Sequence, residues 1–234
     1  MKIRGILFDK DGTLFRYSET WDAWCGIVLE KLSNGDGALL KHLASAVDFD
    51  IQSQMIKPQS MVIACTTREV AERLAPMLNN WSLGAIEKFL NEQVYYLPLA
   101  EVTPLRSFFS DLRSRGLKVG VMTNDSEDNA LAQLVSANLK PLDDLDFVAG
   151  YDSGYGAKPA PDPLLAFAKA VELPPSDVAM VGDSLHDLTA GLRAGMKTIG
   201  VLTGLATRAD LSPVADIILP DISHILTFLR NRVD

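Results

Sequence analysis

The chain has 234 residues, with 22 lysines and arginines against 30 aspartates and glutamates, which gives a formal net charge of -8. This length allows one large domain or two modest ones, and the negative surface disfavours nucleic acid as a partner because it repels polyanions. Hydrophobic residues make up 47% and charged residues 22% of the chain, so a disordered or collagen-like protein is excluded.

The amino-terminal part of the chain predicts one buried strand followed by a helical segment. Residues 3 to 8 are mostly apolar, as in a strand buried on both faces. Residues 15 to 98 show no convincing pair of strands, and apolar residues recur there at helical spacing. The helical stretches are Trp21 to Leu32, Ala38 to Val47, Val70 to Leu78 and Leu83 to Leu90.

From residue 99 onward, short apolar runs alternate with amphipathic helices, which predicts βα units and a parallel sheet. The first helix is expected to be capped by Thr103, to open at Pro104 and to close at Gly116. Later helices are expected to start at Asp125 or Ser126 and at the cap-plus-proline pair Asp162-Pro163. Two more are expected at 185 to 192 and 222 to 232. The expected strands are 117 to 122, 147 to 149, 178 to 181, 198 to 202 and 217 to 219.

These elements predict an α/β fold, with a Rossmann-like parallel sheet, helices on both faces and an inserted α-helical cap domain. The simplest division assigns residues 1 to 14 and 99 to 234 to the α/β core and residues 15 to 98 to the insert. Ligands of open α/β sheets bind at the carboxyl ends of the strands. An insert that directly follows the first strand is therefore expected to cover that crevice as a lid.

Two acidic clusters follow predicted strands. Asp9 and Asp11 lie beside Gly12 after the first strand, and Asp183 and Asp187 follow the strand at 178 to 181. An Asp-Gly turn or a helix N-cap explains either cluster alone. Two acidic clusters at the same sheet edge, however, repel each other unless a cation neutralises them, and Mg²⁺ prefers carboxylate oxygens. Together the clusters favour a divalent metal site.

Two further segments contain candidate anion-binding groups. Thr123 and Asn124 end a strand and precede a helix, where a hydroxyl and free backbone N–H groups form a natural anion site, although ordinary capping explains the same pair. Lys158 lies in a loop rich in glycine and proline, and the alternative for it is a solvated lysine.

The order of these segments resembles the four motifs of the haloacid dehalogenase superfamily. The matching positions are Asp9 to Thr13 for DxDGT, Val119 to Thr123 for the strand ending in threonine, Lys158 before proline, and Asp183 with Asp187 for the last acidic motif. The insert is similar to the small helical (C1-type) cap of phosphoglycolate phosphatase-like members.

This resemblance implies a role for each matching residue. Asp9 would attack phosphorus and become an aspartyl-phosphate, and Asp11 would act as general acid and then as general base. The phosphate would be held by Gly12, Thr123, Asn124 and Lys158. Mg²⁺ would be bound by Asp9, Asp11 and Asp183, with Asp11 contributing its carbonyl and Asp187 lying close by to orient Lys158 or a metal-bound water.

The function implied is a Mg²⁺-dependent phosphatase that acts on a small phosphorylated metabolite. Asp11 disfavours dehalogenation, because the dehalogenases of this superfamily lack an acid at that position. Two alternatives stay open: a phosphosugar mutase that uses the same residues, and a non-enzymatic receiver-like phospho-switch. We expect a monomer or homodimer.

The insert itself contains weaker candidates. Tyr17, Trp21 and Trp24 could face a substrate, but aromatic residues at helical spacing more often belong to the core, and we expect core positions. Arg68 lies near a predicted helix start and could contact a second anionic group of the substrate, although a solvated arginine is the ordinary alternative.

The cysteine content and hydropathy give an expected location. Cys25 and Cys65 are too few for a disulfide framework, and no apolar run resembles a signal peptide or a membrane span. We therefore expect a cytoplasmic protein that does not contact a membrane.

Overall fold

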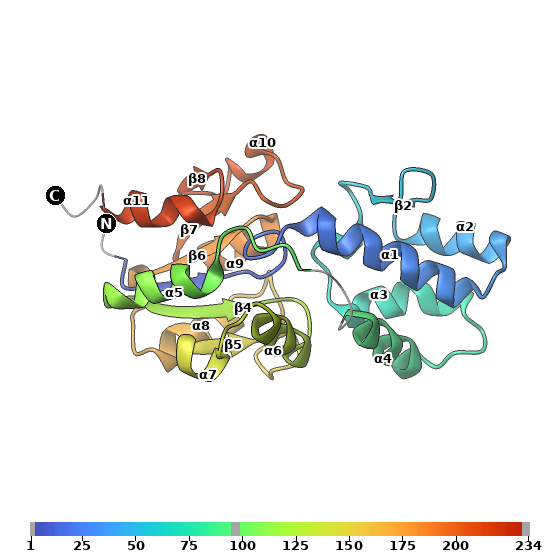
Figure 1. Cartoon of the computed structure of the whole chain (residues 1–234), viewed down its shortest axis with the longest axis horizontal. Coiled ribbons are helices and arrows are strands. Elements are labelled where there is room, and N and C mark those ends of the chain that lie inside the picture. Colours follow the sequence, from blue (N-terminus) through green and yellow to red (C-terminus); the bar gives the residue numbers. More distant parts are fainter. Residues whose placement is uncertain (1–2, 95–98, 231–234) are drawn as a thin grey trace.

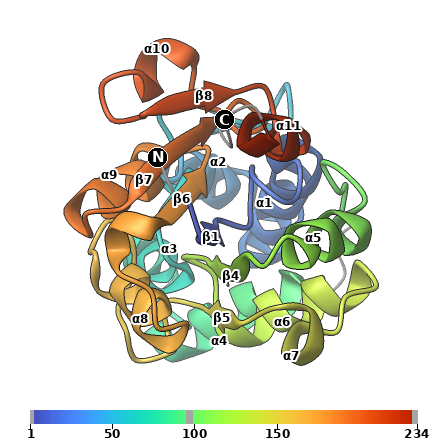
Figure 2. The same cartoon turned by 90° about the vertical axis from the view of Figure 1, so that its left-hand side faces the viewer.

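The computed structural model describes residues 3–94 and 99–230. Its main sheet has six parallel strands in the order β5-β4-β1-β6-β7-β8. These strands are β1 (Gly5–Phe8), β4 (Lys118–Met122), β5 (Phe147–Ala149), β6 (Val178–Gly182), β7 (Lys197–Val201) and β8 (Ile217–Leu219). The expected α/β fold with a parallel sheet is confirmed, and β1 lies in the middle of the sheet (Figure 2).

Helices cover both faces of this sheet. The helices of this part are α5 (Leu105–Ser114), α6 (Glu127–Ser136), α7 (Pro141–Asp144), α8 (Asp162–Ala170), α9 (Leu185–Arg193), α10 (Arg208–Leu211) and α11 (Ile225–Arg230), with short 3-10 turns at Pro175–Asp177 and Ile222–His224. No helix in the described ranges is both long enough and apolar enough to span a membrane.

The central strands β1 and β6 are apolar and buried at every position, because helices cover both faces of the sheet there, whereas the edge strands β5 and β8 are half-buried at most positions. Successive side chains of a strand point to opposite faces. In β1, Ile6 and Phe8 pack in one cluster with α5, α6 and α11, whereas Leu7 packs in a second cluster with α8 and α9. On the second face, Phe167 of α8 fits against Gly120 of β4, where a Cβ atom would approach its ring to 2.8 Å.

A helical segment forms the other part of the molecule (Figure 1). Its helices are α1 (Tyr17–Ser33), α2 (Gly37–Ala46), α3 (Thr67–Leu74) and α4 (Leu83–Val94), with 3-10 turns at Met61–Ile63 and Ala75–Met77. These helices share their own hydrophobic core, separate from the two clusters on the sheet. Each of the four expected helical stretches overlaps one of them.

The expectation that this segment holds no strand pair was wrong. The strands β2 (Phe49–Asp50) and β3 (Met55–Ile56) pair antiparallel. Each has only two residues, which is too short to produce a periodic pattern in the sequence. The Asp22 carboxylate of α1 accepts a hydrogen bond from the Ile56 backbone N–H at 2.7 Å, so a side chain from a distant helix holds the pair in place.

Two expected helix caps also differ from the structure. Thr103 does not cap α5. The Leu105 backbone N–H donates instead to the Glu101 carboxylate at 2.8 Å, and Pro104 is the residue before the helix. Asp162 is the first residue of α8, which follows Pro161, and its side chain does not cap the helix. The short helices α7 and α10 were not expected, since four residues are too few for a helical pattern.

Three phenylalanines form the centre of one sheet face. The ring centroid of Phe8 lies 5.7 Å from that of Phe108 and 5.6 Å from that of Phe109. Because Phe109 is fully buried, Phe109→Ala should lower the free energy of unfolding by about 3–5 kcal/mol, measured by urea denaturation. Val135→Ala on the exposed face of α6 is the control, with an expected change within about 0.5 kcal/mol. Equal losses for the two variants would contradict the assigned core.

Candidate active site

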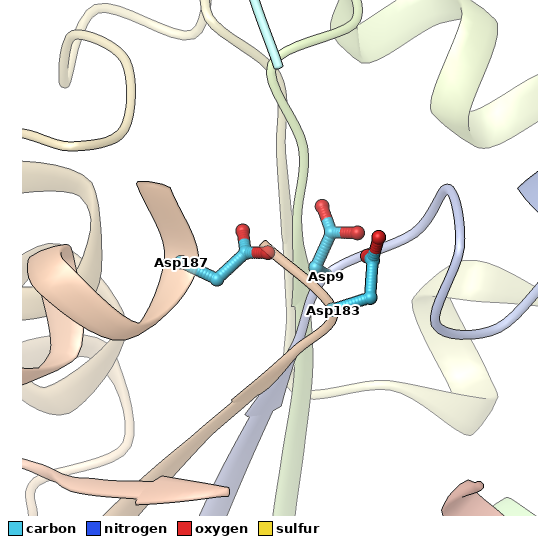
Figure 3. Close-up of side chains that lie close together, drawn as sticks. All are labelled: Asp9, Asp183 and Asp187. Atoms are coloured by element: carbon cyan, nitrogen blue, oxygen red, sulfur yellow. The ribbon is translucent and has the colours of Figure 1, made fainter. Parts of the chain in front are cut away.

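Three aspartates meet at the carboxyl ends of two neighbouring strands. Asp9 follows β1 directly, Asp183 follows β6, and Asp187 lies in the first turn of α9. Because β1 and β6 are paired and parallel, both chains leave the sheet at the same edge. Figure 3 shows the three carboxylates gathered above the strand ends, and each has an oxygen within 4.8 Å of the others.

Lys158 forms ion pairs with two of these carboxylates. Its Nζ lies 2.5 Å from Asp9 Oδ1 and 2.6 Å from Asp187 Oδ1, and its side chain is buried. The second Asp187 oxygen accepts from the Ser184 backbone N–H at 3.0 Å and from the Ser184 hydroxyl at 2.6 Å. The Asp187 side chain is thereby held by Ser184, the residue before α9, and its other oxygen contacts Lys158. Burial alone would lower the pKa of Lys158. The negative charges of Asp187 and Asp9 outweigh this effect and raise the pKa, so this lysine stays charged.

The cluster holds more negative charge than Lys158 neutralises. Burial raises the pKa of Asp9 to about 7, even though the charge of Lys158 acts in the opposite direction. Burial and the charges of Asp9 and Asp187 raise the pKa of Asp183 well above its ordinary value. Three buried carboxylates that face one lysine therefore fit an additional cation, and oxygen donors of this kind suit a hard divalent ion.

Asp11 lies beside this cluster but its carboxylate points elsewhere. Asp11 Oδ2 is 2.7 Å from the Nζ of Lys10, a fully buried lysine that also lies 3.3 Å from Asp125 Oδ2 and donates to Gln133. Asp11 Oδ1 is buried and has no hydrogen-bond partner in the described ranges. In the part of the chain that the structure describes, the group of carboxylates close enough to share a metal includes Asp9, Asp183 and Asp187 but not Asp11.

The Thr123-Asn124 pair also lies at this edge, after β4. Thr123 is buried, and its hydroxyl oxygen accepts from the Asp125 backbone N–H at 3.1 Å. Asn124 holds the backbone of Lys158 on both sides: its Nδ2 donates to the Lys158 carbonyl at 2.9 Å, and its Oδ1 accepts from the Lys158 N–H at 2.9 Å. The same Nδ2 donates to the Ala64 carbonyl of the helical segment at 2.8 Å. The Asn124 side chain thus joins the lysine loop and the helical segment.

Two residues that were not predicted from the sequence, Thr203 and Gly204, lie just after β7 and contact the acidic motifs. The Thr203 hydroxyl, after β7, donates to the carbonyl of Gly12 at 2.5 Å, and Gly12 has a φ of +82° that favours glycine. The backbone of Gly204 lies so close to Asp183 that any Cβ atom would overlap its carboxylate. Their position directly after a predicted strand beside β6 is the signal that could have identified them.

Arg68 is not brought to this site. Its Nε lies 3.0 Å from Glu72 and one terminal nitrogen lies 3.0 Å from Glu87, and the side chain is 44% exposed. Arg68 does not line the cleft, whereas the neighbouring Thr67 does. Because two carboxylates already engage the guanidinium at the surface, this placement does not support the expectation that Arg68 contacts a second anionic group of the substrate.

A cleft lies between the strand ends and the helical segment. The acidic cluster, Lys158, Thr123 and Asn124 line one side, and α1 supplies aromatic residues to the other. Tyr17, Trp21 and Trp24 pack in the core of the helical segment, as expected, and they line the cleft as well. The same residues therefore serve packing and form a wall of the candidate active site.

Comparison with known sequences defines the family. A family model described as haloacid dehalogenase-like hydrolase matches residues 3–195. This match shows that the chain belongs to the haloacid dehalogenase-like hydrolases, as its motifs indicated. The pyrophosphatase PpaX of Bacillus pumilus is 25% identical over 209 residues, which cover 85% of this chain and 83% of that protein. PpaX of Bacillus cereus is 33% identical over 123 residues, so the matched part spans 52% of this chain and 56% of that relative.

Solved structures share the whole fold. A Haemophilus somnus protein described as a predicted phosphoglycolate phosphatase has a TM-score of 0.72 at 16% identity, over 98% of this chain and 99% of its own. The β-phosphoglucomutase of Clostridium difficile has a TM-score of 0.69 at 16% identity, over 98% and 96% of the two chains. At these identities, the likeness establishes the fold alone.

The acidic cluster predicts a pH-dependent response of stability to Mg²⁺. Because the folded-state pKa of Asp9 is raised to about 7, the folded state binds this proton more tightly than the unfolded state. The metal-free protein should therefore lose stability as the pH rises from about 4 to 7. Mg²⁺ should raise the melting temperature more at pH 8 than at pH 5, measured by calorimetry.

Asp183→Asn is the matched variant for this measurement, since it removes one charge of the cluster and keeps the shape of the side chain. Its melting temperature should respond much less to Mg²⁺ at pH 8. An equal Mg²⁺ response at both pH values, or in both proteins, would contradict the metal site.

The close approach of Gly204 to Asp183 gives a second prediction. Gly204→Ala should push the Asp183 carboxylate aside and weaken Mg²⁺ binding about tenfold or more, measured by titration calorimetry. Gly84→Ala is the control, because a Cβ atom at this exposed position of α4 meets nothing within 4 Å. Unchanged Mg²⁺ affinity in Gly204→Ala would show that this contact does not position Asp183.

Proposed function

We propose that this hydrolase is a Mg²⁺-dependent phosphatase that cleaves a small phosphomonoester through an aspartyl-phosphate on Asp9. The observation that supports this most is the contact between Lys158 and Asp9 within a buried acidic cluster. A nucleophilic carboxylate, a fixed cation and backbone amides are what phosphoryl transfer requires, since negative charge spreads over the phosphoryl oxygens in the transition state. The pyrophosphatase names of two relatives agree with hydrolysis of a bond to phosphorus.

In the first half-reaction, an oxygen of Asp9 attacks phosphorus, and the bond from phosphorus to the leaving oxygen breaks. Asp11 gives its proton to that leaving oxygen. Its unpartnered Oδ1 is the atom available for this transfer, because Lys10 holds Oδ2. Lys158 offsets charge on Asp9 and on the transferring group. The products are the free alcohol and the aspartyl-phosphate.

In the second half-reaction, Asp11 removes a proton from a water molecule. That water oxygen attacks phosphorus, the bond to the Asp9 oxygen breaks, and inorganic phosphate leaves. Asp11 regains its proton and Asp9 its carboxylate, so the enzyme returns to its starting state. The Thr123 hydroxyl and the backbone N–H of Asn124 hold the phosphoryl oxygens in both half-reactions. The expected phosphate contact of Gly12 is not supported, because its N–H donates to the Phe15 carbonyl at 2.7 Å.

Mg²⁺ fits the donors of this site. The carboxylates of Asp9 and Asp183 and the backbone carbonyl of Asp11 would hold the ion, with Asp187 beside it. When bound, Mg²⁺ neutralises negative charge on the phosphoryl group and on the acidic cluster. Asp187 has both oxygens engaged by Lys158 and Ser184, so its contribution is to keep Lys158 in place.

We assign residues 15–98 the role of a cap domain and residues 1–14 with 99–234 that of the catalytic core. The separate hydrophobic core of the helical segment and its contact from Ala64 to Asn124 support this division. A cap that closes the cleft excludes water during the first half-reaction.

A phosphosugar mutase is the second candidate. The same Asp9 and Asp11 chemistry would serve it. The hydrogen bond from Asn124 to Ala64 joins the helical segment to the core beside the cleft, which suits a reaction that excludes water. Release of inorganic phosphate as the main product favours the phosphatase. Fast interconversion of sugar phosphates with little release of phosphate favours the mutase. The receiver-like switch is set aside because the chain belongs to a hydrolase family.

Substitutions of the two catalytic aspartates should separate the half-reactions. Asp9→Asn should abolish turnover, because the amide keeps the shape but cannot attack phosphorus. Asp11→Asn should lower turnover by about 100- to 10,000-fold and let the aspartyl-phosphate accumulate when the leaving group is a good one. Phosphate release and single-turnover labelling with para-nitrophenyl phosphate measure the two effects.

Ser18→Ala serves as the control for purification and folding, because Ser18 lies outside the residues that line the cleft. Near-native turnover in Asp9→Asn would disprove its role as nucleophile. Equal losses of Asp11→Asn on activated and unactivated esters would disprove the assignment of Asp11 as acid and base.

A further inference from the structure

The two walls of the cleft differ in charge. The wall from the core contains five aspartates, Lys158 and His186. On the opposite wall, every described residue of the helical segment that lines the cleft is uncharged: three aromatic residues of α1, the segment 62–65, and Thr67 and Val70 of α3. The reacting phosphate must lie against the core wall, near Asp9, so the leaving group of the substrate faces the uncharged wall.

The uncharged wall nevertheless contains hydrogen-bond donors without partners. The Tyr17 hydroxyl, the Trp21 Nε1 and the Trp24 Nε1 are all buried and have no hydrogen-bond partner in the described ranges. Tyr17 and Trp24 are 2% and 3% exposed. The rings lie against one another, with centroids 6.4 Å apart for Tyr17 and Trp21 and 5.1 Å apart for Trp21 and Trp24. Buried donors without partners are costly, so a ligand oxygen that accepts from them is favoured.

Among the described residues of the helical segment, none that lines the cleft is a lysine, an arginine or a histidine. Arg68 is paired with Glu72 and Glu87 at the surface. The amino-terminal end of α3 reaches the cleft through Thr67, but the Glu69 carboxylate already accepts from the Thr66 backbone N–H at 2.7 Å. This end of the helix therefore carries its own negative charge and does not attract a second one.

Together these observations favour a leaving group that carries no charge. A carboxylate or a second phosphate on the leaving group would be buried against an uncharged wall and would face the aspartates of the opposite wall, which is unfavourable without a cation. Resting on the proposed phosphatase function, we propose that the substrate is the phosphomonoester of an uncharged alcohol with several oxygen atoms. Its hydroxyl or ring oxygens accept hydrogen bonds from Tyr17, Trp21 and Trp24, and its apolar C–H face packs on the indole rings.

This inference distinguishes the chain from the activities named for its relatives. Pyrophosphate, the substrate that the name of PpaX indicates, would place a second phosphate on the uncharged wall. Phosphoglycolate, indicated by the name of one structural neighbour, would place a carboxylate there. The ester at the primary hydroxyl of glucose places only neutral oxygens on this wall.

The test compares four phosphorylated compounds with the full-length protein and Mg²⁺. Para-nitrophenyl phosphate reports the chemistry of the core, and glucose phosphate, phosphoglycolate and pyrophosphate differ in the charge of the leaving group. We expect kcat/KM for glucose phosphate to exceed that for each anionic compound about tenfold or more. A higher kcat/KM for phosphoglycolate or pyrophosphate overturns the inference and leaves the phosphatase proposal standing. Absence of Mg²⁺-dependent hydrolysis of para-nitrophenyl phosphate overturns the phosphatase proposal itself.

Two variants test the wall directly. Tyr17→Phe removes the hydroxyl and keeps the ring. It should lower the ratio of kcat/KM for glucose phosphate to kcat/KM for para-nitrophenyl phosphate about tenfold, because only glucose phosphate offers an alcohol oxygen to this hydroxyl. Thr67→Lys adds a cation to the wall and should raise kcat/KM for phosphoglycolate relative to glucose phosphate. Equal effects of Tyr17→Phe on both esters, or no shift in preference with Thr67→Lys, overturn the inference. Thermal melts of both variants establish that they are folded.

Discussion

Buried negative charge without enough positive charge is the constraint on which the rest of this structure depends. Asp9, Asp183 and Asp187 lie within ligand distance of one another, and Lys158 is the lysine that contacts this group. Such a group opposes folding unless the surrounding chain is held firmly around it. Adjacent parallel strands supply that rigidity, because β1 and β6 fix the distance between Asp9 and Asp183 through backbone hydrogen bonds.

The second layer of contacts keeps the charges in place. The Asn124 side chain forms hydrogen bonds with both the N–H and the carbonyl of Lys158. The Ser184 hydroxyl donates to the Asp187 carboxylate, and the Thr13 hydroxyl donates to the Asp183 carboxylate at 3.1 Å. Lys10 holds Asp11 in a similar way. This fully buried lysine contacts Asp11 Oδ2, while Asp11 Oδ1 has no hydrogen-bond partner in the described ranges. Asp187 thus has both oxygens engaged by the protein, whereas Asp11 keeps one oxygen without a partner in the described ranges.

The helical segment contributes shape and hydrogen-bond donors to the cleft, whereas charge comes from the strand ends. This separation follows from the topology, since the insert begins directly after the first acidic cluster and its core is independent of the sheet. The aromatic residues of α1 connect the two parts, because the Trp21 ring lies 5.7 Å from the Nζ of Lys10. In the proposed function, variation in the insert would change the substrate without disturbing the chemistry.

The sequence by itself determined the family, the α/β fold and the order of the strands along the chain, because buried strands, glycines after helices and short acidic motifs depend on local spacing. It also placed Asp9 and Asp183 directly after predicted strands and Lys158 in a loop rich in glycine and proline. Only the tertiary structure decided that Asn124 joins Lys158 to the helical segment, that Arg68 pairs with glutamates, and that Gly204 touches Asp183. The β2–β3 pair likewise rests on Asp22, a residue far from it in the chain. These features join residues that are distant in sequence, and no local pattern records which partner a side chain meets once the chain has folded.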